Sequence, residues 1–140
     1  MSYEVFTHDW AVAWGEAIRA SDGYRKAAQR WQWPMVITMT FGNELDLAER
    51  SVFLDLFEGD CREARSATET DRIAVPFIIS GDFDGWKQVL EHDLDPILAL
   101  MTGKLKLAKG SLASLIPYVT SARELVATAS QVPYRLPEGI

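Results

Sequence analysis

The apolar residues of this chain change their spacing twice, and this change restricts the fold more than any other feature of the sequence. Residues 10–18 carry apolar side chains at helical intervals, whereas residues 35–41 carry them at every second position. The first spacing is typical of an amphipathic helix and the second of a strand. Helical spacing returns after residue 84. Helices, then strands, then helices again indicate an α+β domain, so we expect one sheet with helices segregated largely to one face.

Turn and capping residues set the limits of the expected elements, whose order is ααββββααβα. Helices are expected at residues 10–18, 24–31, 84–90, 96–102 and 111–132, and strands at residues 35–41, 50–60, 61–68, 72–80 and 104–109. Thr7 or Asp9 is expected to cap the first helix, Asp84 the third and Asp95 the fourth.

Several residues mark breaks between or within these elements. Gly42-Asn43 predicts a turn after the first strand, and Pro76 requires a bulge or an unpaired side in the fourth. Pro117 predicts a kink in the last helix. The polar segment 61–68 and the lysine-bearing segment 104–109 suit the edges of a sheet. Residues 134–140 are expected to form a tail.

Composition narrows the class of protein. The 140 residues suit a single domain spanning residues 1–140. Fourteen Lys and Arg against twenty Asp and Glu give a net charge of −6, which argues against a nucleic-acid partner. Cys61 is the single cysteine, so no internal disulfide can form. The apolar runs are too short for a membrane span, and residues 1–4 do not resemble a signal peptide. We therefore expect a cytoplasmic protein.

The reactive side chains do not assemble into a catalytic constellation. His8 and His92 are candidate general bases, but solvated surface histidines are the simpler interpretation. The Cys61 thiol is more readily an idle group than a nucleophile. Asp82 and Asp84 could form a carboxylate pair or bind a metal, and helix capping explains them more simply. Without a phosphate-binding or metalloprotease motif, we expect a binding protein with no cofactor and no metal.

Two segments in the second half of the chain carry a family resemblance. Residues 77–86 have the sequence FIISGDFDGW, and residues 95–110 have the sequence DPILALMTGKLKLAKG. This order of strand, acidic turn, Trp-bearing helix, second helix, glycine turn and short strand resembles the signature half of the sterol carrier protein 2 family. Residues 52–59, VFLDLFEG, resemble the second strand and turn of that family. The similarity covers residues 8–132.

The resemblance implies a five-stranded mixed sheet covered on one face by helices, with an apolar tunnel between the two layers. It also implies non-catalytic binding or transfer of a lipid: a fatty acyl chain, acyl-coenzyme A, phospholipid or sterol. A lipid partner and transient contact with membranes follow from the same resemblance. The chain ends in Pro137-Glu138-Gly139-Ile140 instead of the peroxisomal Ser-Lys-Leu type, which is expected of a bacterial-type stand-alone member.

The family has no compact ligand motif, so the expected tunnel lining is taken from apolar positions on facing strands and helices. Burial of methylene groups, at about 0.8 kcal/mol each, would supply the affinity. The candidate ligand-binding residues are Met39, Leu54, Phe77, Ile79, Trp86, Leu98, Met101, Leu105, Leu115 and Val119.

Two other functions stay open at this point. In the first, a small enzyme holds a hydrophobic substrate in the same cavity while His92 or Asp82 moves a proton. In the second, the domain is a dimerisation or interaction module whose core is filled. A ligand-free structure separates them, because a carrier needs an internal apolar space and a module does not.

Overall fold

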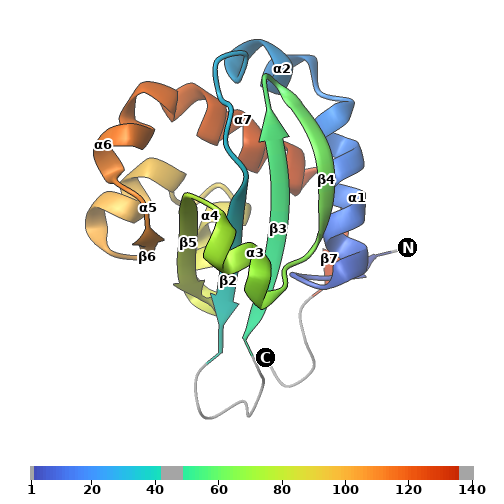
Figure 1. Cartoon of the computed structure of the whole chain (residues 1–140). Coiled ribbons are helices and arrows are strands. Elements are labelled where there is room, and N and C mark those ends of the chain that lie inside the picture. The colour runs from blue at the N-terminus through green and yellow to red at the C-terminus, as the bar shows by residue number, and fades with distance from the viewer. Residues whose placement is uncertain (1, 42–48, 136–140) are drawn as a thin grey trace.

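A five-stranded sheet forms the centre of the computed structural model, which describes residues 2–41 and 49–135 (Figure 1). The strand order is β4-β3-β2-β5-β6. β2 and β5 run parallel and the other neighbours antiparallel, which confirms the predicted mixed sheet. The strands are β2 (Met35–Thr40), β3 (Arg50–Phe57), β4 (Asp60–Ser66), β5 (Phe77–Asp82) and β6 (Leu105–Lys109). As expected, β4 and β6 form the two edges.

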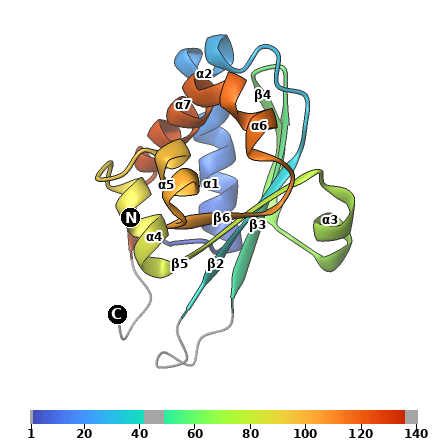
Figure 2. The ribbon, with the colours of Figure 1, turned by 90° about the vertical axis from the view of Figure 1, so that its left-hand side faces the viewer.

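Helices cover one face of this sheet, and a hydrophobic core fills the space between the two layers. Figure 2 shows α3 (Glu69–Ala74) alone on the opposite side of the sheet. The covering elements are α1 (His8–Arg19), α2 (Asp22–Ala27), α4 (Phe83–Leu90), α5 (Pro96–Thr102), α6 (Leu112–Leu115), the 3-10 turn η2 (Ile116–Tyr118) and α7 (Val119–Ser130). The predicted segregation of helices is confirmed with α3 as the exception.

Side-chain caps begin α1 and α5 at predicted residues. The Thr7 hydroxyl accepts a hydrogen bond from the Trp10 backbone N–H (3.4 Å), and Asp95 accepts from two N–H groups at the start of α5. The cap of α4 is Asp82, whose Oδ1 accepts from the Gly85 N–H at 2.8 Å. Capping was the simpler explanation for both Asp82 and Asp84; it is confirmed for Asp82 and was wrong for Asp84, because the helix begins directly at the end of β5.

The central strand β2 is buried on both faces. Met35, Ile37 and Met39 belong to the main core, whereas Val36 packs with Val75 and Ile78 in a small second core on the α3 side. A strand covered on both sides needs apolar or hydrogen-bonded residues at nearly every position. This double coverage explains why the β2 sequence alternates less sharply than that of β3.

The predicted strand at residues 72–80 was wrong in its first half, where the chain forms α3. The Thr68 hydroxyl accepts from the Asp71 N–H (3.2 Å), and the Asp71 carboxylate accepts from the Thr68 N–H (2.7 Å). This reciprocal pair is a capping box, which satisfies two N–H groups at a helix start. β5 then begins after Pro76, so the proline removes no bond from the sheet and needs no bulge.

The final helix breaks where Pro117 predicts, since η2 separates α6 from α7. The expected tail differs from the structure in its first residues. β7 (Tyr134–Arg135) pairs in parallel with β1 (Tyr3–Glu4), and neither two-residue strand has a period that a sequence could show. The predicted turn at Gly42-Asn43 and the rest of the predicted tail lie outside the described residues.

Candidate functional site

An apolar cavity of about 90 Å³ lies between the inner face of the sheet and the helices. Alternation along the strands decides which residues of the sheet face the cavity, because residues two apart on a strand share a face. Ile37 of β2 pairs in register with Ile79 of β5, and both border the cavity. The sheet-side wall consists of Met35, Ile37, Leu56, Ile79 and Leu105.

Helices α5, α6 and α7 and the turn η2 form most of the opposite wall. α7 contributes Ser121, Ala122, Leu125 and Val126, positions that fall on one helical face. α5 contributes Pro96, Ile97 and Leu100, and Leu115 and Tyr118 complete this wall. Among the described residues that border the cavity, none carries a charge. A charged group inside would lose its hydration without gaining a partner, which is strongly unfavourable.

Three tryptophans border the cavity, and the protein itself satisfies each of their indole N–H groups. Trp14 donates to the Thr128 hydroxyl (3.0 Å), Trp31 to the Trp33 carbonyl (2.6 Å) and Trp86 to the Thr38 carbonyl (2.8 Å). A buried ring whose polar atom is bonded in this way has a fixed orientation and presents mainly apolar surface.

The structure brings four of the ten predicted ligand-binding residues to the cavity: Ile79, Trp86, Leu105 and Leu115. Their contact with a ligand stays a prediction. Met39, Leu54 and Phe77 are buried in the main core but do not border the open space. Periodicity identifies the face of a strand on which a residue lies, and it does not locate a void along that face.

The other three predicted residues also lie outside the cavity wall. The side chains of Leu98 and Met101 are 47% and 63% exposed, and Val119 is half-buried. Nearly every residue of α5 is apolar, so its sequence does not reveal which side turns inward. The structure turns Ile97 and Leu100 toward the cavity.

Sequence reasoning missed most of the helical wall. Trp14, Tyr24 and Trp31 lie on the predicted apolar faces of the first two helices, and none of them was a predicted ligand-binding residue. Their aromatic character was the available signal, because large amphipathic rings are common at binding sites. The residues of α7 gave no comparable signal, since small side chains such as Ala122 border a cavity as readily as they pack in a core.

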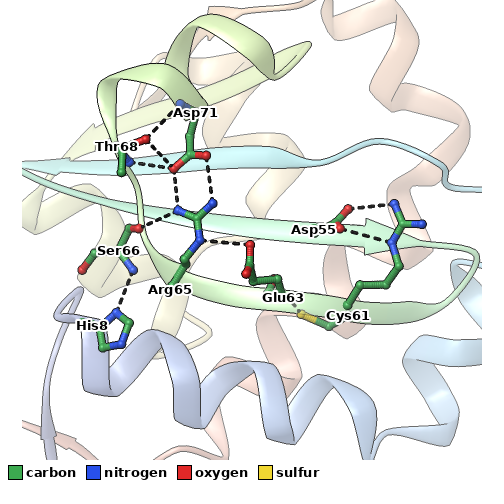
Figure 3. Close-up of polar contacts among 9 residues, drawn as sticks. His8, Asp55, Cys61, Glu63, Arg65, Ser66, Thr68 and Asp71 are labelled. Carbon is green, nitrogen blue, oxygen red and sulfur yellow. Dashed lines mark hydrogen bonds and ion pairs between the residues drawn. The ribbon is translucent and has the colours of Figure 1, made fainter.

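The polar side chains of β4 form a separate cluster away from the cavity (Figure 3). Arg65 donates to both carboxylate oxygens of Asp71 (2.6 and 3.0 Å) and to Glu63 (3.0 Å). The hydrogen bond from Arg65 holds the pKa of Asp71 well below its usual range. The His8 Nδ1 accepts from the Ser66 N–H at 3.2 Å. These groups satisfy one another, which is the arrangement of a structural ion-pair network.

The candidate catalytic residues do not converge on the cavity. The Asp82 carboxylate caps α4, His92 is exposed, and neither borders the cavity. Burial raises the pKa of the Cys61 thiol to about 11, so it stays protonated and weakly nucleophilic. Within residues 2–41 and 49–135, no three His, Cys, Asp or Glu side chains gather as a metal site. No helix in the same ranges has the length and apolar character to cross a membrane.

Neither the protein-family models nor the curated proteins contain a match to this chain. Among solved structures, a crystal structure of sterol carrier protein 2 matches with a TM-score of 0.83 and 37% identity, over 92% of this chain and 99% of that one. This chain belongs to the sterol carrier protein 2 family. A conserved hypothetical protein of Thermus thermophilus matches with a TM-score of 0.83 and 34% identity, over 99% of this chain and 100% of that one.

More distant members of the sterol carrier protein 2 family share the fold alone. The ligand-free Yarrowia lipolytica protein matches with a TM-score of 0.59 and 16% identity, over 90% of this chain and 89% of that one. The segment on which the sequence resemblance rests, residues 77–110, forms β5, α4, α5 and β6. These four elements supply six of the eighteen residues that border the cavity: Ile79, Trp86, Pro96, Ile97, Leu100 and Leu105.

Proposed function

We propose that this protein binds and transfers an apolar lipid ligand in the cavity and catalyses no reaction on it. The observation that carries the proposal is a cavity with an uncharged, apolar wall inside the fold of the sterol carrier protein 2 family. The relative with 37% identity is itself named a sterol carrier protein. The ligand classes in question are a fatty acyl chain, acyl-coenzyme A, a phospholipid or a sterol.

The volume of the cavity sets a condition on this function. At about 90 Å³, the cavity is smaller than an engineered cavity of about 150 Å³ that binds benzene. A long-chain ligand therefore requires the wall to move apart, and the tunnel belongs to this expanded, ligand-bound state. Burial of about 0.8 kcal/mol per methylene offsets the cost of the movement.

A substitution that fills the cavity tests the proposal. Ala122→Phe places a ring at the α7 wall, whereas Ala113→Phe adds the same ring at an exposed position of α6. Displacing about two buried methylenes corresponds to a tenfold loss of affinity. We expect that loss or more in Ala122→Phe and none in Ala113→Phe, measured by titration with fatty acid, acyl-coenzyme A, phospholipid and sterol probes. If the wild type binds none of these probes, the proposal fails.

We also propose transient contact with a membrane as the route by which the ligand enters. The support is α5, whose inner residues border the cavity while Leu98 and Met101 project large apolar side chains to the outside. Replacing both with Ser is expected to slow transfer of a labelled lipid between vesicles and to leave equilibrium affinity unchanged. Unchanged transfer would contradict this route.

The enzyme and dimerisation hypotheses gain no support from the described residues. His92 and Asp82 are not at the cavity, and a pure interaction module has no need of an apolar cavity between sheet and helices. The cytoplasmic location stays a prediction from the sequence.

A further inference from the structure

Arg72 of α3 is bonded to the sheet through neutral groups. Its Nη1 donates to the Thr38 hydroxyl (2.9 Å) and to the Ser51 hydroxyl (3.0 Å), and its Nη2 has no partner among the described residues. The Glu69 carboxylate is exposed and 3.9 Å from the Arg72 Nε, whereas the Arg65 guanidinium is 2.6 Å from its carboxylate partner. The charge of Arg72 is therefore only weakly compensated, and part of its donor capacity is unused.

The two hydroxyl groups bonded to Arg72 carry more hydrogens than they have acceptors. Thr38 Oγ1 and Ser51 Oγ lie 2.8 Å apart, so one of them donates to the other. Each hydroxyl has one hydrogen to donate, and the second hydrogen finds no acceptor in the part of the chain that the structure describes. Thr38 is buried and Ser51 half-buried. Together with the guanidinium, the hydroxyls form a cluster that is rich in donors and lacks an oxygen acceptor.

Strand register extends this cluster across the outer face of the sheet. Thr38 of β2 lies opposite Ser51 of β3 on one side and opposite Ser80 of β5 on the other. Lys106 of β6 lies opposite Ser80. These four side chains point to the outer face, because the residues next to them along each strand belong to the main core on the inner face. Neighbouring strands are about 4.8 Å apart, so the four positions form one continuous row.

Ser80 and Lys106 do not use their polar side-chain atoms within residues 2–41 and 49–135. Ser80 is half-buried and its hydroxyl forms no hydrogen bond there, and the exposed Lys106 ammonium forms neither a hydrogen bond nor an ion pair. The two nearest lysines in the sequence are occupied. Lys109 Nζ donates to a carbonyl in the last turn of α3 at 2.7 Å, and Lys104 Nζ is 3.5 Å from the Asp84 carboxylate. Lys106 is thus a cation at the end of the row with its donors available.

The donors of this row are of the kinds that bind phosphate in proteins. Hydroxyl, ammonium and guanidinium groups all donate to phosphate oxygens, and the charged donors form the stronger bonds. An uncharged ligand would leave both cations without a counter-ion. Of the nearby carboxylates, Glu69 is exposed at the rim, and Asp82 accepts from the Gly85 N–H as the cap of α4. The row itself contains no acid, so an anion over Ser80 meets donors on both sides.

We propose that Ser51, Thr38, Ser80 and Lys106, together with Arg72, form a phosphate-binding site on the outer face of the sheet. The phosphate lies over Ser80, between the Arg72 guanidinium and the Lys106 ammonium. It belongs either to a free phosphate compound or to the headgroup of a membrane lipid, two sources with the same chemistry. Because α3 lies on the opposite side of the sheet from the other helices (Figure 2), this site is separate from the cavity and does not depend on the carrier function.

Two lysine variants test this site, because they change the net charge equally. Lys106→Gln removes a donor of the row, whereas the control Lys104→Gln removes a lysine that pairs with Asp84. Ser80→Ala removes a hydroxyl without a change of charge. The probes are inorganic phosphate, followed by the shifts of backbone amide NMR signals, and phosphatidylcholine vesicles with and without phosphatidate, followed by co-sedimentation. Ionic strength is held constant, since it screens exposed charges.

We expect the wild type and Lys104→Gln to bind phosphate or phosphatidate vesicles alike. Lys106→Gln should bind about tenfold more weakly, the loss of one charge-assisted hydrogen bond, and Ser80→Ala about two- to tenfold more weakly. Thermal unfolding of Lys106→Gln should match that of the wild type. Binding of inorganic phosphate identifies a free phosphate compound as the source, and binding of phosphatidate vesicles alone identifies a lipid headgroup.

Equal losses in Lys106→Gln and Lys104→Gln would overturn the inference, because net charge alone would then explain the binding. Absence of binding by both probes would also overturn it. Neither result would touch the carrier function, which is tested by lipid affinity in the cavity, and that affinity should be the same in Lys106→Gln as in the wild type.

Discussion

The side chains on the two faces of the sheet differ in how completely they are packed and hydrogen-bonded. On the outer face, Arg65 is bonded to Asp71 and Glu63 and lies over the Phe53 ring at 4.4 Å, and Arg62 forms a two-bond pair with Asp55. On the inner face, an apolar wall leaves about 90 Å³ open. Side chains that are fully packed and bonded stabilise the fold. An apolar wall beside an open space can still gain free energy when a ligand fills that space. The difference indicates that stability and binding are separable in this molecule.

The largest effect is expected within the inner face, where filled core adjoins the cavity. Leu54→Ala removes a fully buried side chain from the core and should cost about 2–5 kcal/mol of unfolding free energy in urea titration. Leu56→Ala should also destabilise the protein, but it enlarges the cavity and should favour bulkier ligands. If Leu54→Ala changed ligand preference more than Leu56→Ala, Leu54 and not Leu56 would border the ligand.

A smaller loss of stability is expected from the outer face. Asp71→Ala removes both the α3 capping box and the Arg65 pair, and we expect a cost of about 2 kcal/mol. Ligand affinity should not change. Glu69→Ala is the control, because its carboxylate is exposed and 3.9 Å from Arg72, a contact worth less than about 1 kcal/mol. A change of ligand affinity in Asp71→Ala would show that the two faces are coupled.

Trp86→Phe should change the optical response to ligand more than it changes stability. The substitution removes the N–H that donates to the Thr38 carbonyl, at a cost of about 1 kcal/mol. A long-chain acyl ligand should produce a saturable change in tryptophan emission in the wild type, reduced in this variant but not abolished, because Trp14 and Trp31 also border the cavity. Trp33→Phe, which lies outside the cavity wall, should retain the change. An undiminished response in Trp86→Phe would mean that the ligand does not pass this ring.

The smallest expected effect is the dependence of folding stability on acidic pH. Because the pKa of Asp71 is lowered in the folded state from its ordinary 3.8, its contribution to stability is complete above pH 3.8. The contribution decreases as the pH falls from there through the folded-state pKa. The stability difference between wild type and Asp71→Asn, measured by urea unfolding, should therefore be constant from pH 7 to 5 and shrink below pH 4. A difference that stayed constant to pH 2 would show that the Asp71 charge contributes nothing.

Most of the fold follows from local patterns in the sequence. The structure contains the helix predicted from the spacing of residues 10–18 and the strand predicted from that of residues 35–41. It also ends α5 at the predicted turn, Gly103. α3 was missed because it has six residues, buries none of them and begins with a Thr-Glu-Thr-Asp cap that was not recognised. The pairing of β1 with β7 joins residues more than 130 positions apart, and no local pattern specifies such a contact.

The cavity was less predictable than the fold. Ile79 and Leu105 follow from strand alternation, because the inner face of the sheet is fixed once the strands are. The choice between Leu98 and Leu100 on α5 depends on how that helix is rotated against α7.

The pairing of β1 with β7 has a mechanical consequence. The Tyr3 N–H donates to the Pro133 carbonyl (3.0 Å) and the Val5 N–H to the Arg135 carbonyl (3.1 Å), which joins the start of α1 to the end of α7. This pairing fixes α1, which contributes Trp14 to the cavity wall, relative to α7, which contributes four residues. The movement that the proposed ligand entry requires is then expected in α5, α6 and η2, which are short and form no strand pairing of this kind within the described residues. The Arg123–Asp95 ion pair (2.6 Å) holds only the start of α5 to α7. Amide exchange in these three segments should respond to ligand, while the amides of α1 and α7 remain protected throughout.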